Sequence, residues 1–222
     1  MMRWCRLPAC RKAIQALNQN REDICNINAG LRNAALPLLA NIASGDQNTL
    51  VRADAINTLS VLKDPAYLEL FKKGLNSPSY SVSGAALNGI SHIDPTLGLS
   101  LAKRFENDNE GQLTQAIISV YADRSYNTQW PFVYQRYMAA GFQDQVHLTK
   151  AFSGMVGRLT RQEAVLQGID ELKQLAIRYK GDGAAPFMIK FLNSIKDQRI
   201  GLNDPAGAKA SLDAIQQIND AK

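Results

Sequence analysis

The chain has 222 residues, of which 45% are apolar and 20% are charged, an ordinary balance for a globular protein of one large domain or two small ones. The longest nearly uncharged apolar stretch, residues 34–43, has half the length that a bilayer crossing requires, so the sequence predicts no transmembrane helix. The three cysteines, Cys5, Cys10 and Cys25, contain no C-x-x-C pair. They therefore exclude a disulfide framework and a zinc ribbon, and they leave the compartment open.

Most of the net charge of +5 comes from the beginning of the chain. Residues 1–32 carry six basic and two acidic side chains, and the rest of the chain carries 19 basic and 18 acidic ones. A nucleic-acid interface needs basic residues clustered on the folded surface, so we expect neither nucleic acid nor a membrane as a partner. The basic residues and Pro8 also interrupt any apolar core of a signal peptide, which predicts a soluble chain without an export signal. These basic residues are Arg3, Arg6, Arg11, Lys12, Arg21 and Arg32.

Helical periodicity begins after the first 28 residues. Residues 31–43 predict a helix in which Pro37 marks either a kink or a late start, and residues 45–48 predict a turn. The segment 50–62 then places its apolar side chains on one stripe of a helix with 3.6 residues per turn. These side chains are Val51, Ala55, Ile56, Leu59 and Leu62.

The dipeptide Asp64-Pro65 predicts the start of the next helix, because aspartate is a good N-cap and proline is tolerated at the first helical position. The same pattern then repeats. Five apolar positions recur at an offset of 31 residues, and Asp94-Pro95 recurs at an offset of 30. The repeated positions are Val82, Ala86, Leu87, Ile90 and Ile93, and a weaker third copy without proline consists of Ala116, Ile117 and Val120.

A repeat of this length, made of a helix, a tight turn and a second helix, is typical of helical solenoids. We therefore expect an all-α fold, a right-handed α-solenoid or α/α superhelix of antiparallel HEAT-like helix pairs, with about 10 to 12 helices. The predicted repeat domain covers residues 29–222. Residues 1–28 form a separate, non-periodic basic segment that we expect to be poorly ordered.

Downstream of the repeats the sequence predicts longer helices and essentially no sheet. Thr160 and Glu163 predict a capping box at the start of the longest helix, and residues 180–183 predict its C-cap rather than a phosphate loop. The five predicted helices are 128–140, 144–156, 161–180, 184–195 and 205–221.

The residues that could carry chemistry are few. Neither His92 nor His147 belongs to an H-E-x-x-H pattern, so we interpret both as surface or satisfied core histidines. Ser153 lacks the first glycine of a nucleophile elbow. Residues 106–111 resemble the first half of a calcium loop, but Ile117 stands where the bidentate glutamate belongs, which favours a plain turn. We therefore predict no catalytic, cofactor-binding or metal-binding residue in this chain.

One segment is dense in aromatic residues and carries two arginines among them. Such a set could stack a ligand, but large aromatics at the change from short repeats to longer helices more often fill an irregular core, which is the interpretation we favour. The set consists of Tyr121, Tyr126, Trp130, Phe132, Tyr134 and Tyr137, with Arg124 and Arg136.

The sequence S-P-S-Y-S-V-S-G-A-A-L over residues 77–87, with Asp94-Pro95 and the earlier V-R-A-D-A-I over 51–56, resembles the HEAT-like helical region at the C-terminus of bacterial family M1 zinc aminopeptidases, the gluzincin class. The resemblance covers residues 29–200. In that family an H-E-x-x-H motif with a later glutamate holds the metal, and a G-x-M-E-N type motif recognises the substrate amine. Both motifs belong to an upstream catalytic domain, and neither occurs in this chain.

The resemblance implies a non-catalytic domain of a hydrolase, which packs on a catalytic domain and walls off its peptide substrate cavity. It implies zinc only in that catalytic domain. The helical domain would pack on the catalytic domain either within one longer chain or in trans. Self-association is a further expectation. The two methionines at the non-periodic start are consistent with a severed C-terminal piece, or with a catalytic portion encoded upstream. A free-standing HEAT-type scaffold for protein partners is the alternative, and an enzyme with an unrecognised site is the third reading.

Overall fold

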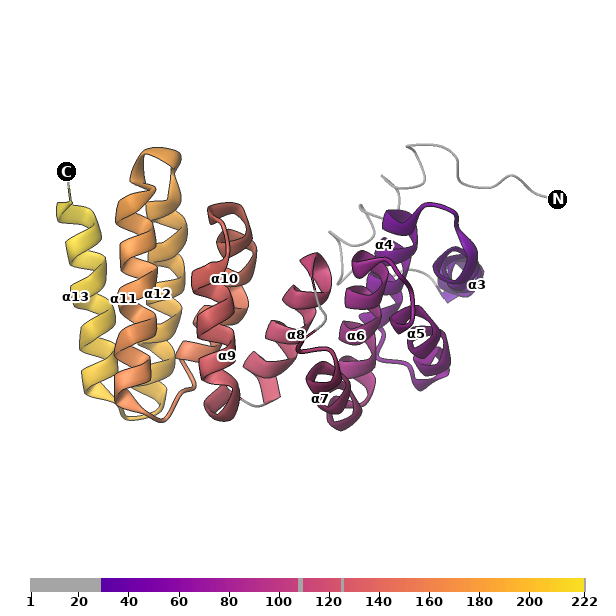
Figure 1. Cartoon of the computed structure of the whole chain (residues 1–222), viewed down its shortest axis with the longest axis horizontal. Helices are drawn as coiled ribbons and strands as arrows, with labels where there is room; N and C mark the ends of the chain where they lie inside the picture. Colours follow the sequence, from indigo (N-terminus) through magenta and orange to yellow (C-terminus); the bar gives the residue numbers. More distant parts are fainter. Residues whose placement is uncertain (1–28, 108–109, 125, 222) are drawn as a thin grey trace. The chain divides into compact units, whose positions relative to one another are not determined.

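The computed structural model describes residues 29–107, 110–124 and 126–221. These residues contain eleven α-helices, α3 to α13, together with two single-turn 3-10 helices and no strand (Figure 1). The prediction of an all-helical protein is thus confirmed for the described part of the chain. The basic segment 1–28 and the three cysteines within it, Cys5, Cys10 and Cys25, lie outside the described residues.

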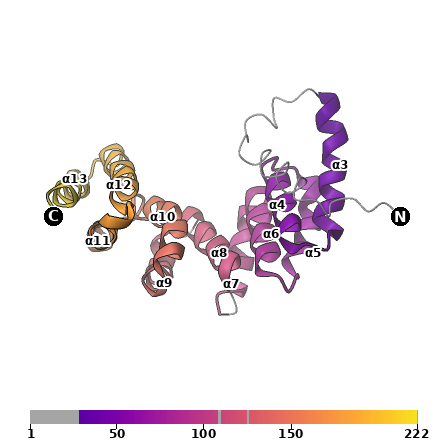
Figure 2. The same cartoon turned by 90° about the horizontal axis from the view of Figure 1, so that it is seen from above.

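The chain divides into two compact units, residues 1–120 and 121–222, and the boundary falls inside α8 (Gly111–Arg124). In unit 1, α6 packs against α4, α5 and α7, and α4 also packs against α3 (Figure 2). The helix α6 is therefore the centre of this unit. The elements before α8 are α3 (Ala29–Gly45), α4 (Thr49–Ser60), η1 (Pro65–Tyr67), α5 (Leu68–Leu75), α6 (Tyr80–Ile93) and α7 (Pro95–Arg104).

The apolar repeat read from the sequence is also a repeat in burial. In each of the first two copies the first four positions are buried, and the fifth, Leu62 or Ile93, is half-buried. The three positions of the weaker copy, on α8, are buried as well. Burying these stripes against neighbouring helices removes apolar surface from water, which is the main force that assembles the helices.

Both Asp-Pro dipeptides cap helices, as predicted. The Asp64 carboxylate accepts a hydrogen bond from the Ala66 amide at 2.9 Å, and the Asp94 carboxylate accepts one from the Leu97 amide at 2.9 Å. The first dipeptide opens a 3-10 turn that leads into α5, and the second opens α7 directly. Pro37 lies inside α3 rather than at its start, so the late-start alternative is wrong.

Two glycines let helices of unit 1 approach closely. A Cβ atom on Gly84 would lie 2.5 Å from the backbone oxygen of Gln112 on α8, and one on Gly89 would lie 2.7 Å from the ring of Phe71 on α5. Both distances are below normal van der Waals contact. The missing side chains are therefore what allows α6 to sit against its neighbours.

In unit 2, α12 packs against α10, α11 and α13, and α11 also packs against α13 (Figure 1). The helices α9 and α10 pack against each other. The elements that follow α8 are α9 (Tyr126–Ala139), α10 (Phe142–Val156), α11 (Gln162–Arg178), η2 (Lys180–Asp182), α12 (Ala184–Gly201) and α13 (Pro205–Asp220).

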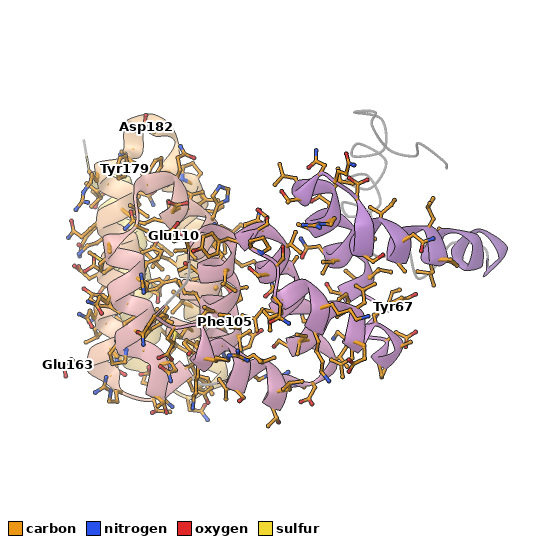
Figure 3. The ribbon with its side chains drawn as sticks, turned by 45° about the vertical axis from the view of Figure 1, so that its right-hand side comes forward. Tyr67, Phe105, Glu110, Glu163, Tyr179 and Asp182 are labelled. Carbon is orange, nitrogen blue, oxygen red and sulfur yellow. The ribbon has the colours of Figure 1, made fainter. Side chains whose placement is uncertain are left out.

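The turn between α11 and α12 confirms the predicted C-cap. Gly183 has a left-handed φ of 79°, its amide bonds the Lys180 carbonyl, and the Ala184 amide bonds the Tyr179 carbonyl, which is the hydrogen-bond pattern of a Schellman motif. The Lys180 ammonium also donates to the carbonyl oxygens of Ile218 and Ala221 at the end of α13. This turn, which carries Tyr179 and Asp182 in Figure 3, therefore also fastens the end of α13.

The predicted capping box is wrong. The helix α11 begins at Gln162, and Arg161 is its N-cap residue, without a side-chain capping bond. The Thr160 amide and hydroxyl instead donate to the side-chain oxygen of Asn127 on α9, at 3.0 and 3.1 Å. A long-range partner has thus replaced the local one, and the exposed Glu163 stands near the start of α11 (Figure 3).

A buried arginine joins three helices of unit 2. Arg199 on α12 is 4% exposed, and its guanidinium donates to the carbonyl oxygens of Leu159 at 2.7 Å and Gly157 at 3.3 Å, just after α10. Its Nε also donates to the Asp204 carboxylate at 2.7 Å. The second oxygen of Asp204 accepts the Gly207 amide at 3.0 Å and so caps α13.

Hydrogen bonding controls the ionisation of Asp204. Burial alone would raise the pKa of its carboxyl, but the hydrogen bond from the Gly207 amide and the ion pair with Arg199 outweigh burial and hold the pKa below its usual value. The folded state therefore favours the ionised carboxylate. The resulting stabilisation is present above the ordinary aspartate pKa and disappears as the pH falls through the lower pKa of the folded state.

Gly84→Ala tests the close approach of α6 and α8. Alanine favours helix formation by about 1 kcal/mol over glycine, yet we expect this variant to lose about 1 to 3 kcal/mol of unfolding free energy, because its Cβ would collide with backbone atoms. Gly45→Ala is the control, since nothing lies within 4 Å of a Cβ at that position. Urea unfolding followed by circular dichroism measures both variants. An unchanged or higher stability of Gly84→Ala would contradict the packing described for α6.

Asp204→Asn tests the buried ion pair. Asparagine can still cap α13 but leaves Arg199 without a counter-charge, so we expect a loss on the order of 3 kcal/mol at neutral pH. The free energy of unfolding of the unmodified chain should also fall more steeply between neutral pH and about pH 3 than that of the variant, because only the former loses an ionised Asp204. Asp213→Asn, at an exposed position of the same helix, is the control. Parallel pH profiles for Asp204→Asn and the unmodified chain would refute this account.

Candidate functional site

The two histidines and the serine singled out in the sequence have different surroundings. His92 is exposed on α6 in unit 1, and His147 is exposed on α10 in unit 2. Ser153 on α10 is buried, and its hydroxyl donates to the Lys150 carbonyl at 3.2 Å. Within residues 29–107, 110–124 and 126–221 no three histidine, cysteine, aspartate or glutamate side chains gather as a metal site would require.

The segment that resembled half of a calcium loop connects α7 to α8, and Glu110 in Figure 3 lies just before α8. Two of its positions, 108 and 109, fall outside the described residues. Ile117, at the position of the expected bidentate ligand, is fully buried on α8. An apolar core side chain occupies the place of an oxygen ligand, so the interpretation as a turn between helices holds.

The aromatic set of unit 2 builds a core rather than an open stacking surface. Tyr121, Trp130 and Tyr137 are buried, and the other three members are half-buried. Tyr137 stacks on Phe152 of α10 with ring centroids 3.9 Å apart, and Trp130 contacts the same ring at 5.4 Å. The favoured core interpretation is confirmed for the three buried members.

The residue at the centre of this cluster, Phe152, was not predicted from the sequence. Phe152 is fully buried and connects α10 to Trp130 and Tyr137 of α9. It lies outside the aromatic-rich segment and directly precedes Ser153 in the sequence. The helical spacing of Leu148, Phe152 and Met155 on α10 was the available signal.

A closed network of polar groups surrounds Tyr137. Its hydroxyl shares a hydrogen bond with the Thr149 hydroxyl at 3.0 Å, the Thr149 hydroxyl reaches the Gln145 carbonyl at 2.7 Å, and the Gln145 amide donates to the Tyr137 carbonyl at 3.0 Å. Burial raises the pKa of Tyr137 to about 12. The phenol therefore stays protonated at neutral pH and serves as a structural hydrogen-bonding group.

At the rim of the cluster, one aromatic side chain interacts with a carboxylate and another with a guanidinium group. The Tyr134 hydroxyl donates to the Glu171 carboxylate of α11 at 2.7 Å, and burial followed by the nearby Glu171 raises the pKa of Tyr134. The Arg136 guanidinium lies over the Phe132 ring, 5.4 Å from its centroid. The first contact connects α9 to α11, and the second lies within α9.

Unit 1 has a surface pocket that the sequence analysis did not identify. The pocket has a volume of about 460 Å³ and is lined by residues from the end of α3, from α4 and α5, and from the start of α6. Two of the lining side chains are cationic, and no acidic side chain is among the described residues around it. The cationic pair is Arg52 on α4 and Lys73 on α5.

Several large apolar side chains are exposed in unit 2. Ile200 is 58% exposed in the last turn of α12, Leu202 is 57% exposed just after it, and Leu212 on α13 is 51% exposed. Leu166, near the start of α11, is also exposed. Single exposed apolar residues are normal on protein surfaces, so these four are candidates for a contact surface only in combination.

No protein-family model matches the sequence, and neither a curated protein nor a solved structure matches it. Among the helices that the structure describes, none is both long enough and apolar enough to span a bilayer.

The arrangement of these residues generates a prediction about metal and hydrolysis. We expect the purified chain to hold no stoichiometric zinc and to leave aminoacyl arylamides intact, because it lacks H-E-x-x-H and no cluster of ligating side chains occurs among the described residues. Elemental analysis after dialysis without chelator measures the metal, and a chromogenic arylamide assay measures hydrolysis. One zinc ion retained per chain would overturn this expectation.

Proposed function

We propose that this chain is a non-catalytic C-terminal helical domain of an M1-type zinc aminopeptidase, which packs on the catalytic domain and helps to enclose its substrate cavity. The observation that carries the proposal is the segment of residues 77–87 that resembles this family. Its apolar and small members, among them Val82, Ala86 and Leu87, form the buried core of α6. The resemblance therefore rests on residues that have a definite structural role.

The HEAT-like solenoid belongs to this proposal. Its support is that the copies with an offset of 31 residues are two helices, α4 and α6, that pack directly against each other and bury equivalent positions. Each copy is followed by an aspartate-capped turn and a further helix. Repetition of one helix pair with a shared buried face is the building principle of helical solenoids.

The enclosing role needs a surface that meets another domain. Ile200, Leu202 and Leu212 offer apolar contact area near the end of α12 and on α13. Interfaces between domains of one chain bury on the order of 600 to 1,500 Å², which is enough for recognition when the two parts are supplied separately. A chain that presents such a surface to water also tends to self-associate.

Binding to a catalytic fragment tests the proposal. We expect the full chain to co-elute with a separately expressed M1 catalytic fragment from the same source, if one is encoded upstream, and to self-associate in light scattering. Ile200→Lys should weaken the complex by about tenfold or more, because it places a charge in an apolar contact. Lys190→Ala, at an exposed position on the same helix, should leave binding unchanged.

The same experiment separates the alternative. A monomeric chain that shows no association with that fragment at tens of micromolar, where interactions of about 7 kcal/mol are visible, favours a free-standing HEAT-type scaffold. A sequence immediately upstream with H-E-x-x-H and a later glutamate supports the aminopeptidase domain. If a stop codon separates the chain from an unrelated upstream sequence, this supports the free-standing scaffold.

A further inference from the structure

The pocket of unit 1 combines two cations with apolar walls. Arg52 and Lys73 supply the positive charge, and Leu70 and Pro78 supply apolar surface. Asn76 and Ser44 add an amide and a hydroxyl group to the lining. Pockets that bind small molecules combine apolar walls with a few polar groups that orient the ligand, and this pocket offers both kinds of group.

The arginine is incompletely satisfied. The Nε atom of Arg52 is buried and has no hydrogen-bond partner among the described residues, and neither Arg52 nor Lys73 forms an ion pair within them. The preceding lysine, Lys72, differs, because its ammonium group pairs with the Glu69 carboxylate at 2.8 Å. A guanidinium nitrogen withdrawn from water without a partner costs free energy, and an anion in the pocket would recover that cost.

The pocket walls narrow the class of anion. A guanidinium binds planar carboxylates through two parallel hydrogen bonds, and it binds phosphates equally well. A free phosphate, however, has no apolar part to place against Leu70 and Pro78. A carboxylate carried on an apolar group would satisfy the cations and the apolar wall together.

We propose that this pocket binds an apolar carboxylate, such as an acylated apolar amino acid or the C-terminal residue of a peptide. The carboxylate meets Arg52 and Lys73, and the apolar group lies against Leu70 and Pro78. The volume of about 460 Å³ falls within the range of small-molecule pockets. This site lies wholly in unit 1 and does not depend on the function proposed above.

Calorimetry on the full chain tests the site with defined probes. N-acetyl-leucine and the peptide Ala-Ala-Ala-Leu should bind saturably, and their C-terminal amides should bind at least about tenfold more weakly, because they lack the charge. Comparing the free acid with the peptide shows which source of carboxylate the pocket prefers. Inorganic phosphate is the probe for an anion without an apolar group, and it should bind more weakly than N-acetyl-leucine.

Variants connect binding to the named residues. Arg52→Gln and Lys73→Gln should each weaken N-acetyl-leucine binding by about ten- to a hundredfold. Lys72→Gln, on the same helix as Lys73 but outside the pocket lining, should leave it unchanged. Thermal unfolding by circular dichroism identifies any variant that fails to fold, and the acid-versus-amide comparison on the unmodified chain does not depend on the variants.

Four results would overturn the proposal. They are saturable binding of none of the probes, equal binding of acid and amide, phosphate binding as tight as that of N-acetyl-leucine, and an equal loss of binding in the Lys72→Gln control.

Discussion

The guanidinium of Arg199 is the interaction on which the arrangement of unit 2 depends most. One side chain satisfies two carbonyl oxygens after α10 and the carboxylate that caps α13, while its own backbone belongs to α12. A buried charge is tolerated only when its hydrogen-bonding groups are satisfied, so the ends of the three helices have to meet at this point. The Lys180 ammonium fastens the opposite end of α13 through the carbonyls of Ile218 and Ala221.

Close packing at small residues, rather than a buried charge, holds unit 1 together. Its centre, α6, carries glycines where neighbouring helices come closest, at Gly84 against α8 and at Gly89 against Phe71. In unit 1 the shape of a small-residue surface determines how the helices pack together. In unit 2 the packing is determined by buried polar groups that need partners. The aromatic cluster around Phe152 adds a second, apolar, set of constraints to unit 2.

These features indicate which groups are already used in folding and which could bind a ligand or a partner. Several polar side chains of the unit 2 core are used up within the core, as in the network of Tyr137, Thr149 and Gln145. The groups that remain open to a ligand or a partner lie at the surface instead. They are the cationic pocket of unit 1 and the exposed apolar side chains of α11 to α13. The exposed apolar side chains support the proposed contact with a catalytic domain, and the cationic pocket carries the proposed carboxylate site.

The sequence by itself determined the helical class, the buried stripes of α4 and α6, both aspartate caps and the C-cap at Gly183, because periodicity and capping depend on residues within a few positions of each other. Only the tertiary structure decided which polar group meets which. Thr160 bonds Asn127 instead of capping α11, Phe152 rather than the aromatic-rich segment is the centre of the aromatic core, and Arg199 and Arg52 have opposite surroundings. Each of these outcomes depends on which residues helix packing brings close together. A local sequence pattern does not contain that information.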